Sequence, residues 1–352
     1  MSQKTVLVTG SSGHLGCALM LTLPELGYHP IGIDILPTST ATHVGSITDT
    51  EFLTSIFKQY TFHSILHTAT LHKPHIGSHS KSDFISVNIT GTTLLLEHAS
   101  SASTPVKSFI FTSSTTTFGR ALSPAPGKPA VWINEDVVPK PKNIYGVTKI
   151  AAEDICELIH RQTGMPVVVL RTSRFFPEQD DVESRREGWS DDNLKVNEFC
   201  YRRVDLADVV SAHVTAMEKA ESKDVIWGKY IISAPPPFAS TPETLALLDQ
   251  NAGEALKGVV EGYEAVYGKL GWKFLDRVDR VYDSSKAVRE LGWKPVYTFQ
   301  RALSCVERGE EWRSEVAIKV GKRGYHAVPT GVYTTAVVGD GGDTIGGEKV
   351  SS

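Results

Sequence analysis

The sequence predicts an α/β protein with a doubly wound parallel β-sheet and a smaller C-terminal region. Three observations support this fold class. Short apolar runs of strand length alternate with amphipathic stretches of helix length. The first apolar run is followed at once by a glycine-rich turn and a helical pattern. Further along, Tyr145 and Lys149 stand four residues apart, a spacing that places both side chains on one side of a helix.

The composition of the 352-residue chain narrows the classes of protein to consider. Its length allows one large domain or two moderate ones. The net charge of -4, without a dense basic run, argues against a nucleic-acid partner. The four cysteines are far apart and form no CxxC pattern, which favours a reducing compartment and no cysteine metal site. Without an apolar run of about 20 residues or a signal peptide, we expect a cytoplasmic protein with no membrane partner.

The first element is a buried strand at residues 5–9, apolar on both faces. The turn Gly10-Ser11-Ser12-Gly13-His14-Leu15-Gly16 follows, and a helical pattern extends to about Leu26. In such a turn Gly10 permits the bend, Gly13 lets a pyrophosphate approach, and Gly16 lets the helix pack on the strand. The helix start, at His14 and Leu15, offers unpaired N–H groups to the phosphates. The pattern predicts a dinucleotide site; a glycine-rich turn without a ligand is the alternative.

The second strand, residues 29–34, ends in Asp34. An acid at this place binds the adenosine ribose hydroxyls in dinucleotide-binding folds. Its carboxylate would repel a 2′-phosphate, and no arginine follows at residues 35–37. We therefore expect NAD rather than NADP, with an acidic strand end in solvent as the alternative.

Residues 49–60 have a helical pattern, and the third strand, residues 64–69, leads into His67-Thr68-Ala69-Thr70 at the expected ligand edge of the sheet. The segment that follows holds His72, His75 and His79. A metal site is one interpretation, but Pro74 and Gly77 leave no helical or strand register that would bring three rings together. We predict a solvated loop and no metal site, with His72 as a residue that could face a substrate.

Polar side chains follow the fourth strand, residues 106–112, which comes after a long amphipathic helix at residues 84–99 containing Asn88. The strand ends in the run Thr112-Ser113-Ser114-Thr115-Thr116-Thr117. Hydroxyls at the carboxyl end of a strand would lie over the ligand crevice, where one could bind a substrate oxygen. The alternative is that they only cap the strand and its turn.

After a proline-rich loop at residues 121–141, a helix carries Tyr145 and Lys149 and runs to about Gly164. A nearby ammonium favours a phenolate, so we expect Lys149 to lower the pKa of Tyr145. A tyrosine of that kind can donate and accept a proton near neutral pH. A chance pair on a surface helix is the alternative.

The rest of the chain is less distinctive. A fifth buried strand spans residues 167–171, and the highly charged stretch 178–192 is expected to be a solvated or mobile loop, placed where a substrate lid would be. A helix at 205–218 and a sixth strand at 229–233 follow. We expect residues 1–177, completed by 200–234, to form the nucleotide-binding domain, and residues 178–199 and 235–320 the substrate-binding region. The tail, 323–352, is expected to be partly disordered.

Together these motifs resemble the extended short-chain dehydrogenase/reductase family, in its NAD-dependent epimerase/dehydratase group. The resemblance spans about Lys4 to Trp312. It includes Val204-Asp205-Leu206-Ala207-Asp208 and the late Leu291-Gly292-Trp293 segment. It implies a Rossmann-type fold with Tyr145 as acid/base, Lys149 on the nicotinamide ribose, and Ser114, or else Ser113, on the substrate oxygen. It also implies that NAD contacts the glycine turn, Asp34, Ser46, Ile47, Thr68, Ala69 and Asn88.

Several positions depart from the family pattern. Ser46 and Ile47 stand where the family usually has Asp and an apolar residue beside adenine. Arg174 stands where UDP-sugar epimerases commonly carry a substrate-binding asparagine, and the stretch 174–203 is short for one that clasps a nucleotide. These departures favour a smaller substrate, and Arg174 could pair with an acidic or phosphorylated group. Thr115 and Thr116, in place of an Asp-Glu pair, disfavour a dehydratase; Thr115 remains a candidate substrate contact.

The sequence thus predicts an NAD-dependent oxidoreductase or epimerase that transfers hydride at a secondary alcohol or ketone carbon of a sugar-like or small metabolite. The alternatives are an NADPH-dependent ketone or aldehyde reductase and a non-catalytic NAD-binding regulatory protein. Epimerisation and net oxidation are not separated by the sequence. A homodimer through the Asn88 and Tyr145 helices is compatible with apolar residues such as Ile150, Ile155, Leu158 and Ile159.

Overall fold

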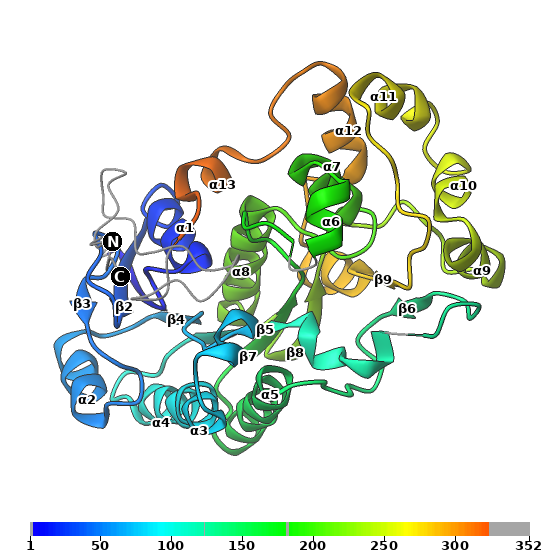
Figure 1. The fold of residues 1–352 in the computed structure, drawn as a ribbon. Helices are drawn as coiled ribbons and strands as arrows, with labels where there is room; N and C mark the ends of the chain where they lie inside the picture. Colours follow the sequence, from blue (N-terminus) through cyan, green and yellow to red (C-terminus); the bar gives the residue numbers. More distant parts are fainter. Residues whose placement is uncertain (1–2, 123, 181–182, 324–352) are drawn as a thin grey trace, which may run out of the picture.

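The computed structural model describes residues 3–122, 124–180 and 183–323 and confirms the doubly wound α/β fold (Figure 1). Parallel strands form one sheet in the order β3-β2-β1-β4-β5-β7-β8. Their bounds are β1 (Lys4–Thr9), β2 (Tyr28–Asp34), β3 (His43–Val44), β4 (Ser64–His67), β5 (Ser108–Ser114), β7 (Val167–Thr172) and β8 (Trp227–Ile232). The strand order runs in opposite directions on the two sides of β1 and β4, which is where such sheets bind ligands.

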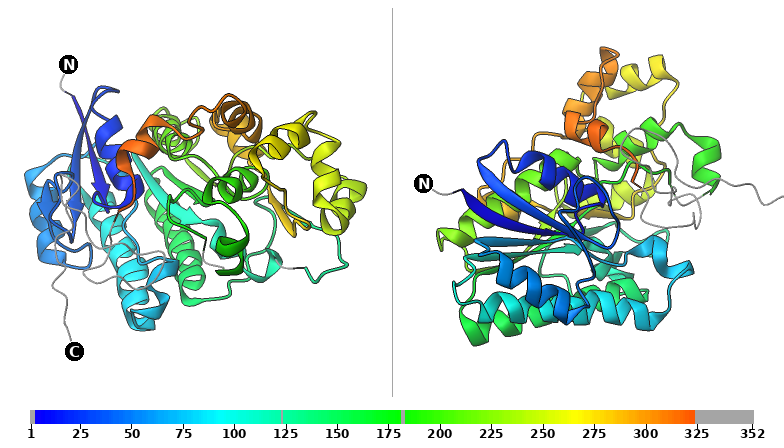
Figure 2. Two further views of the ribbon diagram at one scale, coloured as in Figure 1. Left: turned by 45° about the horizontal axis from the view of Figure 1, so that its top comes forward. Right: turned by 90° about the vertical axis from the view of Figure 1, so that its left-hand side faces the viewer.

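Helices cover both faces of the sheet, as the side view in Figure 2 shows. One face packs against α1 (His14–Thr22), α8 (Leu206–Glu221) and α13 (Glu315–Val320). The other packs against α2 (Thr50–Gln59), α4 (Thr92–Ser101) and α5 (Ile144–Thr163). In β1, Val6 and Val8 enter the first core and Leu7 enters the second. The apolar runs read from the sequence are therefore buried on both faces, as in other parallel sheets.

The predicted helix at 84–99 is a continuous stretch of three parts. It comprises α3 (Lys81–Ile85), the π-helical turn η2 (Ser86–Gly91) and α4. Asn88 lies within the π-helical turn, and the Thr92 Oγ1 donates a hydrogen bond to the Asn88 carbonyl at 2.8 Å. Such turns re-aim side chains and frequently occur at functional sites.

A third core, separate from the two on the faces of the sheet, lies at the C-terminal end of the molecule. It is built around Leu256, Tyr267 and Phe299. Its surrounding elements are α7 (Asp191–Glu198), α9 (Pro242–Gln250), α10 (Ala252–Lys257), α11 (Tyr263–Leu270) and α12 (Phe299–Glu307). Beside them β6 (Val131–Ile133) pairs in parallel with β9 (Arg280–Tyr282). The prediction that the whole stretch 121–141 is a loop is therefore wrong, because β6 lies within it. The short turns are η1 (Lys73–Gly77), η3 (Thr115–Phe118), η4 (Arg120–Leu122) and η5 (Ala287–Leu291).

The prediction of a solvated loop at 178–192 is only partly right: residues 184–192 are exposed or half-buried, but the stretch is largely helical and its first acidic residues are buried. Helix α6 (Glu183–Gly188) and the start of α7 lie in this stretch. Glu178 and Asp180 are each only 5% exposed. Asp180 is buried because arginine side chains, among them Arg174 and Arg202, surround its carboxylate. Sequence alone shows the charges but not that they neutralise one another.

Two further expectations concern membrane-spanning helices and the C-terminal tail. Within residues 3–122, 124–180 and 183–323, no helix is both long enough and apolar enough to span a bilayer. The tail predicted to be disordered, 323–352, falls outside the described residues except for Arg323.

Candidate active site

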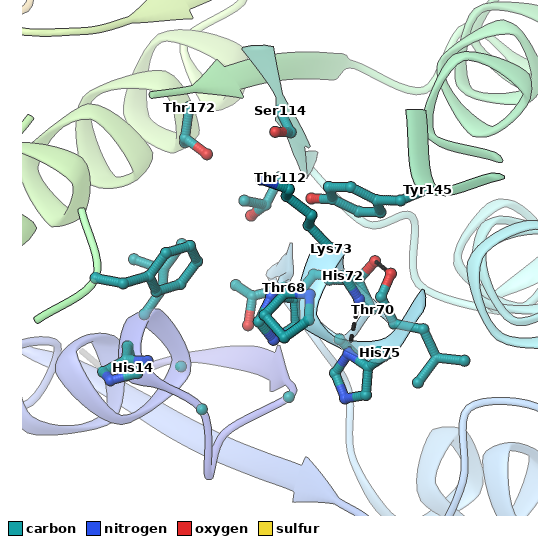
Figure 3. A pocket seen from close by; sticks show the side chains of 18 of the residues that line it. His14, Thr68, Thr70, His72, Lys73, His75, Thr112, Ser114, Tyr145 and Thr172 are labelled. Carbon is teal, nitrogen blue, oxygen red and sulfur yellow. Dashed lines mark hydrogen bonds between the residues drawn. The ribbon is translucent and has the colours of Figure 1, made fainter. Parts of the chain in front are cut away.

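A cavity of about 430 Å³ lies along the carboxyl ends of β1, β2, β4, β5 and β7. This volume is in the usual range for small-molecule sites. Figure 3 shows His14 on one side of the pocket, His72 and His75 on another, and Tyr145 near Ser114 and Thr112. The cavity therefore joins the glycine turn after β1 to the start of α5.

The glycine turn forms one wall of this cavity. Gly10 adopts φ +69°, and a Cβ there would lie 2.7 Å from the Ala69 nitrogen. A Cβ on Gly16 would lie 2.0 Å from the Gly10 carbonyl oxygen, so α1 can pack this close only without a side chain. Gly10, Gly13, His14, Leu15 and Gly16 all line the cavity, as predicted for a phosphate-binding turn.

Asp34, at the end of β2, lies beside this turn. Its Oδ2 accepts a hydrogen bond from the Ser12 backbone at 2.9 Å, and its Oδ1 accepts one from the Leu36 backbone at 2.9 Å. Burial raises the pKa of the Asp34 carboxyl, and these backbone donors oppose the rise. The Asp34 side chain is thus held at the cavity wall. This excludes the alternative that Asp34 is only an acidic strand end in solvent.

The walls of the cavity after β3 and β4 also contain the residues that the sequence indicated. Ser46 and Ile47 line it after β3, and Thr68 and Ala69 line it after β4. The Thr9 hydroxyl fixes this second wall, since its Oγ1 accepts hydrogen bonds from the Thr68 and Ala69 backbones at 3.2 and 3.1 Å.

Ser114 and Tyr145 meet at the far end of the cavity. Ser114 is the last residue of β5, and the side chain of Asn143 caps α5 so that Tyr145 lies in its first turn. Figure 3 shows the Tyr145 phenol near Ser114, whose hydroxyl donates a hydrogen bond to Thr116 Oγ1 at 3.0 Å. Ser113, the alternative substrate-binding serine, instead donates to the buried Glu153 Oε1 at 2.6 Å.

The expected lowering of the Tyr145 pKa is not found. Burial raises the pKa of Tyr145 to about 12, although the nearby Ser114 hydroxyl lowers it in part. Burial also lowers the pKa of Lys149 to about 7, so the lysine is only partly charged near neutral pH. The spacing of the two residues is visible in the sequence, but the depth at which the lysine is buried is not.

Lys149 and Asn88 do not line the cavity, and their contact with NAD stays a prediction. Lys149 is 2% exposed and its Nζ lies 4.2 Å from the centroid of the Phe111 ring. The Asn88 Oδ1 accepts from the Leu71 backbone at 2.8 Å, and its Nδ2 donates to Thr148 Oγ1 at 3.0 Å. In this structure Asn88 fixes the cavity wall to α5.

The three histidines after β4 are closer together than predicted. The short helix η1 brings the ring centroids of His72 and His75 to 4.6 Å and those of His75 and His79 to 5.0 Å. The predicted solvated loop thus contains a short helix and a buried His75, while residues 76–79 are exposed as expected. No set of three or more metal-capable side chains suited to a metal ion occurs within the described ranges. His72 lines the cavity, which is the place expected for a substrate contact.

Arg174 and Thr115 both line the cavity. The Arg174 guanidinium is, however, engaged within the chain: its Nη1 lies 3.1 Å from Asp180 Oδ2 and 3.4 Å from Glu198 Oε1. An anionic substrate group would have to share this arginine with two carboxylates, which weakens the predicted role.

Other lining residues were missed by the sequence analysis. They come from segments with no recognised motif: Phe176, Glu178, Arg202, Arg280 and Tyr282. Glu153 was also missed, although it lies four residues after Lys149 on the same helix. That spacing continues the Tyr145–Lys149 series and is a signal that could have found it.

Comparison with known proteins places this geometry in a family. A family model described as "NAD dependent epimerase/dehydratase family" matches residues 6–190, more than half of the chain. The chain belongs to the NAD-dependent epimerase/dehydratase family. This confirms the resemblance read from the motifs.

Relatives of this epimerase-family chain include UDP-glucose 4-epimerases. That of Yersinia pestis is 25% identical over 339 residues, covering 82% of this chain and 92% of the relative. That of Rhizobium meliloti is 24% identical over 354 residues, covering 89% and 98%.

Solved structures of the same family share the fold. A Thermotoga maritima UDP-glucose 4-epimerase with UDP-glucose has a TM-score of 0.58 at 23% identity and covers 86% of this chain and 97% of its own. A Bacillus cereus UDP-glucuronic acid 4-epimerase with UDP-glucuronic acid and NAD has a TM-score of 0.55 at 19% identity, covering 86% and 98%.

Proposed function

We propose that this protein binds NAD and oxidises a secondary alcohol of a sugar-like substrate, returning the hydride to complete an epimerisation. The observation that carries the proposal is that Ser114 and Tyr145 line the same cavity as the glycine turn and Asp34. The epimerases among its relatives favour return of the hydride over net oxidation.

The residues of the cavity fit a dinucleotide. The glycine turn and the start of α1 would hold the pyrophosphate, Asp34 the adenosine ribose, and Ser46 and Ile47 the adenine side. The fixed carboxylate of Asp34 disfavours a 2′-phosphate, so we propose NAD over NADP. This disfavours the alternative of an NADPH-dependent reductase.

Ser114 would hold the substrate oxygen while Tyr145 exchanges the proton. In the free protein Tyr145 is a protonated phenol at neutral pH, the form that donates a proton to a carbonyl oxygen. Bound oxidised NAD supplies the hydride acceptor and a positive charge, which favours the phenolate needed to take a proton from an alcohol. Because Ser114 and Tyr145 line the same cavity as the proposed NAD site, we do not favour a non-catalytic binding protein.

The substrate side would be formed by segments from the C-terminal half of the chain. Arg280 and Tyr282 of β9 and Arg202 line the cavity beside Thr115. We therefore propose that residues 178–199 and 235–320 supply substrate contacts. Arginines suit a substrate with an acidic or phosphorylated group. Such a group would have to share Arg202 with Asp180 and Glu198. It would likewise share Arg280 with Asp279. The names of the relatives make UDP-sugars the first class to test, whereas the departures at Arg174 favour a smaller one.

The test is a screen of the purified protein with NAD. UDP-glucose, UDP-galactose and UDP-glucuronic acid should be followed by NMR for inversion at a carbinol carbon, and smaller polyols and sugar phosphates by absorbance for NADH. Inversion without net NADH would support the proposal. Net NADH formation without inversion would show a dehydrogenase instead. Failure to bind NAD at all would contradict the proposal.

We also propose a homodimer through the outer face of α3 and α5. Ile85, Val147 and Leu158 are 47%, 48% and 51% exposed there. These helices lie beside one another in Figure 1. Leu158→Glu should reduce the oligomeric mass measured by light scattering if this face pairs.

A further inference from the structure

The segment after β7 forms part of the wall of the proposed dinucleotide cavity. Phe175, Phe176 and Glu178 line the cavity together with the glycine turn on one side and the β4–η1 connection on the other. These three walls belong to parts of the chain that are far apart in sequence. The segment 175–178, called the strap below, contacts both of the other walls.

Phe176 makes an aromatic contact on each side. Its ring centroid lies 5.5 Å from that of His14, in the first turn of α1, with an interplanar angle of 60°. It also lies 5.5 Å from that of His72, before η1, with the rings stacked at 26°. Figure 3 shows His14 and His72 on different elements around the pocket. Phe176 therefore spans the cavity from one wall to the other.

Glu178 adds a charged contact on the α1 side. Its Oε1 lies 3.1 Å from His14 Nε2, and the two side chains are 5% and 1% exposed. The start of a helix carries a partial positive charge that attracts anions. Glu178 thus places a carboxylate next to the helix terminus at which a dinucleotide pyrophosphate would bind.

A dinucleotide that lies along this cavity has to pass beneath the strap. Its pyrophosphate would approach the α1 terminus, and its nicotinamide would extend past Thr68 toward Tyr145. We propose that Phe176 and Glu178 are cofactor-retaining residues: the strap must open for the dinucleotide to enter or leave, and it slows both steps. This inference rests on the proposed function.

The strap would serve the chemistry proposed above. In an epimerisation the reduced dinucleotide must remain bound until the hydride returns to the substrate. A closed strap keeps the dinucleotide in place through this interval. In a dehydrogenase, by contrast, the reduced cofactor has to leave in every cycle.

The experiment measures NADH exchange by the full chain in a stopped-flow fluorimeter. Association is followed on mixing, and dissociation by chasing with excess NAD. Phe176→Ala should accelerate both rates by about tenfold or more, which corresponds to about 1.4 kcal/mol of lost strap contacts. Glu178→Gln should accelerate association, since it removes a carboxylate that competes with the pyrophosphate.

Two variants serve as controls. Phe176→Tyr keeps the ring and should restore slow exchange. Ile76→Ala alters an η1 residue that is 39% exposed and lies outside the cavity lining, and it should leave both rates unchanged.

The outcomes separate the two proposals. Faster dissociation of Phe176→Ala with unchanged association would show that Phe176 only contacts the bound dinucleotide, and would overturn the strap. Unchanged exchange in both Phe176→Ala and Glu178→Gln would overturn it as well, while the proposed function would stand. Absence of dinucleotide binding by the wild type in equilibrium dialysis would overturn both.

Discussion

Ser114 and Tyr145 line the same cavity, Ser114 where β5 ends and Tyr145 where α5 begins. The neighbouring hydroxyl, Ser113, points away to Glu153 instead. Two adjacent serines that the sequence cannot tell apart therefore have different partners. One faces the proposed reaction site and the other belongs to a buried ionic network.

This difference predicts distinct effects of two alanine substitutions. Ser114→Ala should lower kcat by about 100-fold, as removal of one donor to a reacting oxygen does in other enzymes. Because Ser114 lowers the Tyr145 pKa, its loss should also move the rising limb of the pH–rate profile for alcohol oxidation to higher pH. Ser113→Ala should lower the free energy of unfolding but leave kcat close to that of the wild type. The opposite pattern would make Ser113 the substrate-binding serine.

Asp34 should determine cofactor preference. Asp34→Asn keeps an acceptor for only one of the Ser12 and Leu36 backbone N–H groups, and it removes the charge that repels a 2′-phosphate. We expect the ratio of NADPH to NADH dissociation constants to fall at least about tenfold, a change of about 1.4 kcal/mol, in fluorescence titrations. A wild type that already binds NADPH more tightly than NADH would contradict the role given to Asp34.

The buried pair of Arg171 and Glu153 should dominate the stability of the site. Arg171 donates to both carboxylate oxygens, with Nε–Oε1 at 3.0 Å and Nη2–Oε2 at 2.7 Å, and both side chains are buried. Arg171→Met should destabilise the fold by about 3–5 kcal/mol, because it leaves a buried carboxylate short of its partner. Denaturant unfolding at pH 7 measures the loss.

A double-mutant cycle provides the control for this pair. Adding Glu153→Gln to Arg171→Met should recover a large part of the lost stability, since the uncompensated charge is then gone. Strictly additive losses would show that the two side chains do not act as a pair.

Local patterns predicted the framework of the fold well. The β1 strand, glycine turn and α1 follow from residues within one short stretch, so their relation is visible without tertiary information. The placement of Asp34 and Ser114 at the cavity follows from one rule, that parallel strands present their carboxyl ends at the same edge.

Features that depend on distant contacts were not predicted. Arg174 was expected to be available to a substrate, but Asp180 and Glu198 engage it from segments whose fold the sequence did not reveal. The pKa of Tyr145 was predicted in the wrong direction because burial acts on both Tyr145 and Lys149. Spacing shows that two side chains share a helix face, but it does not show whether that face is buried.

The most direct test of the central claim is Tyr145→Phe, examined for turnover and for NADH affinity in the same preparation. The phenol would exchange the substrate proton but contributes little to holding the dinucleotide. We predict that kcat falls by at least about 100-fold, in line with the loss of a general acid–base group, while the NADH dissociation constant changes less than about threefold. Turnover close to that of the wild type would contradict the assignment of Tyr145 as the acid/base.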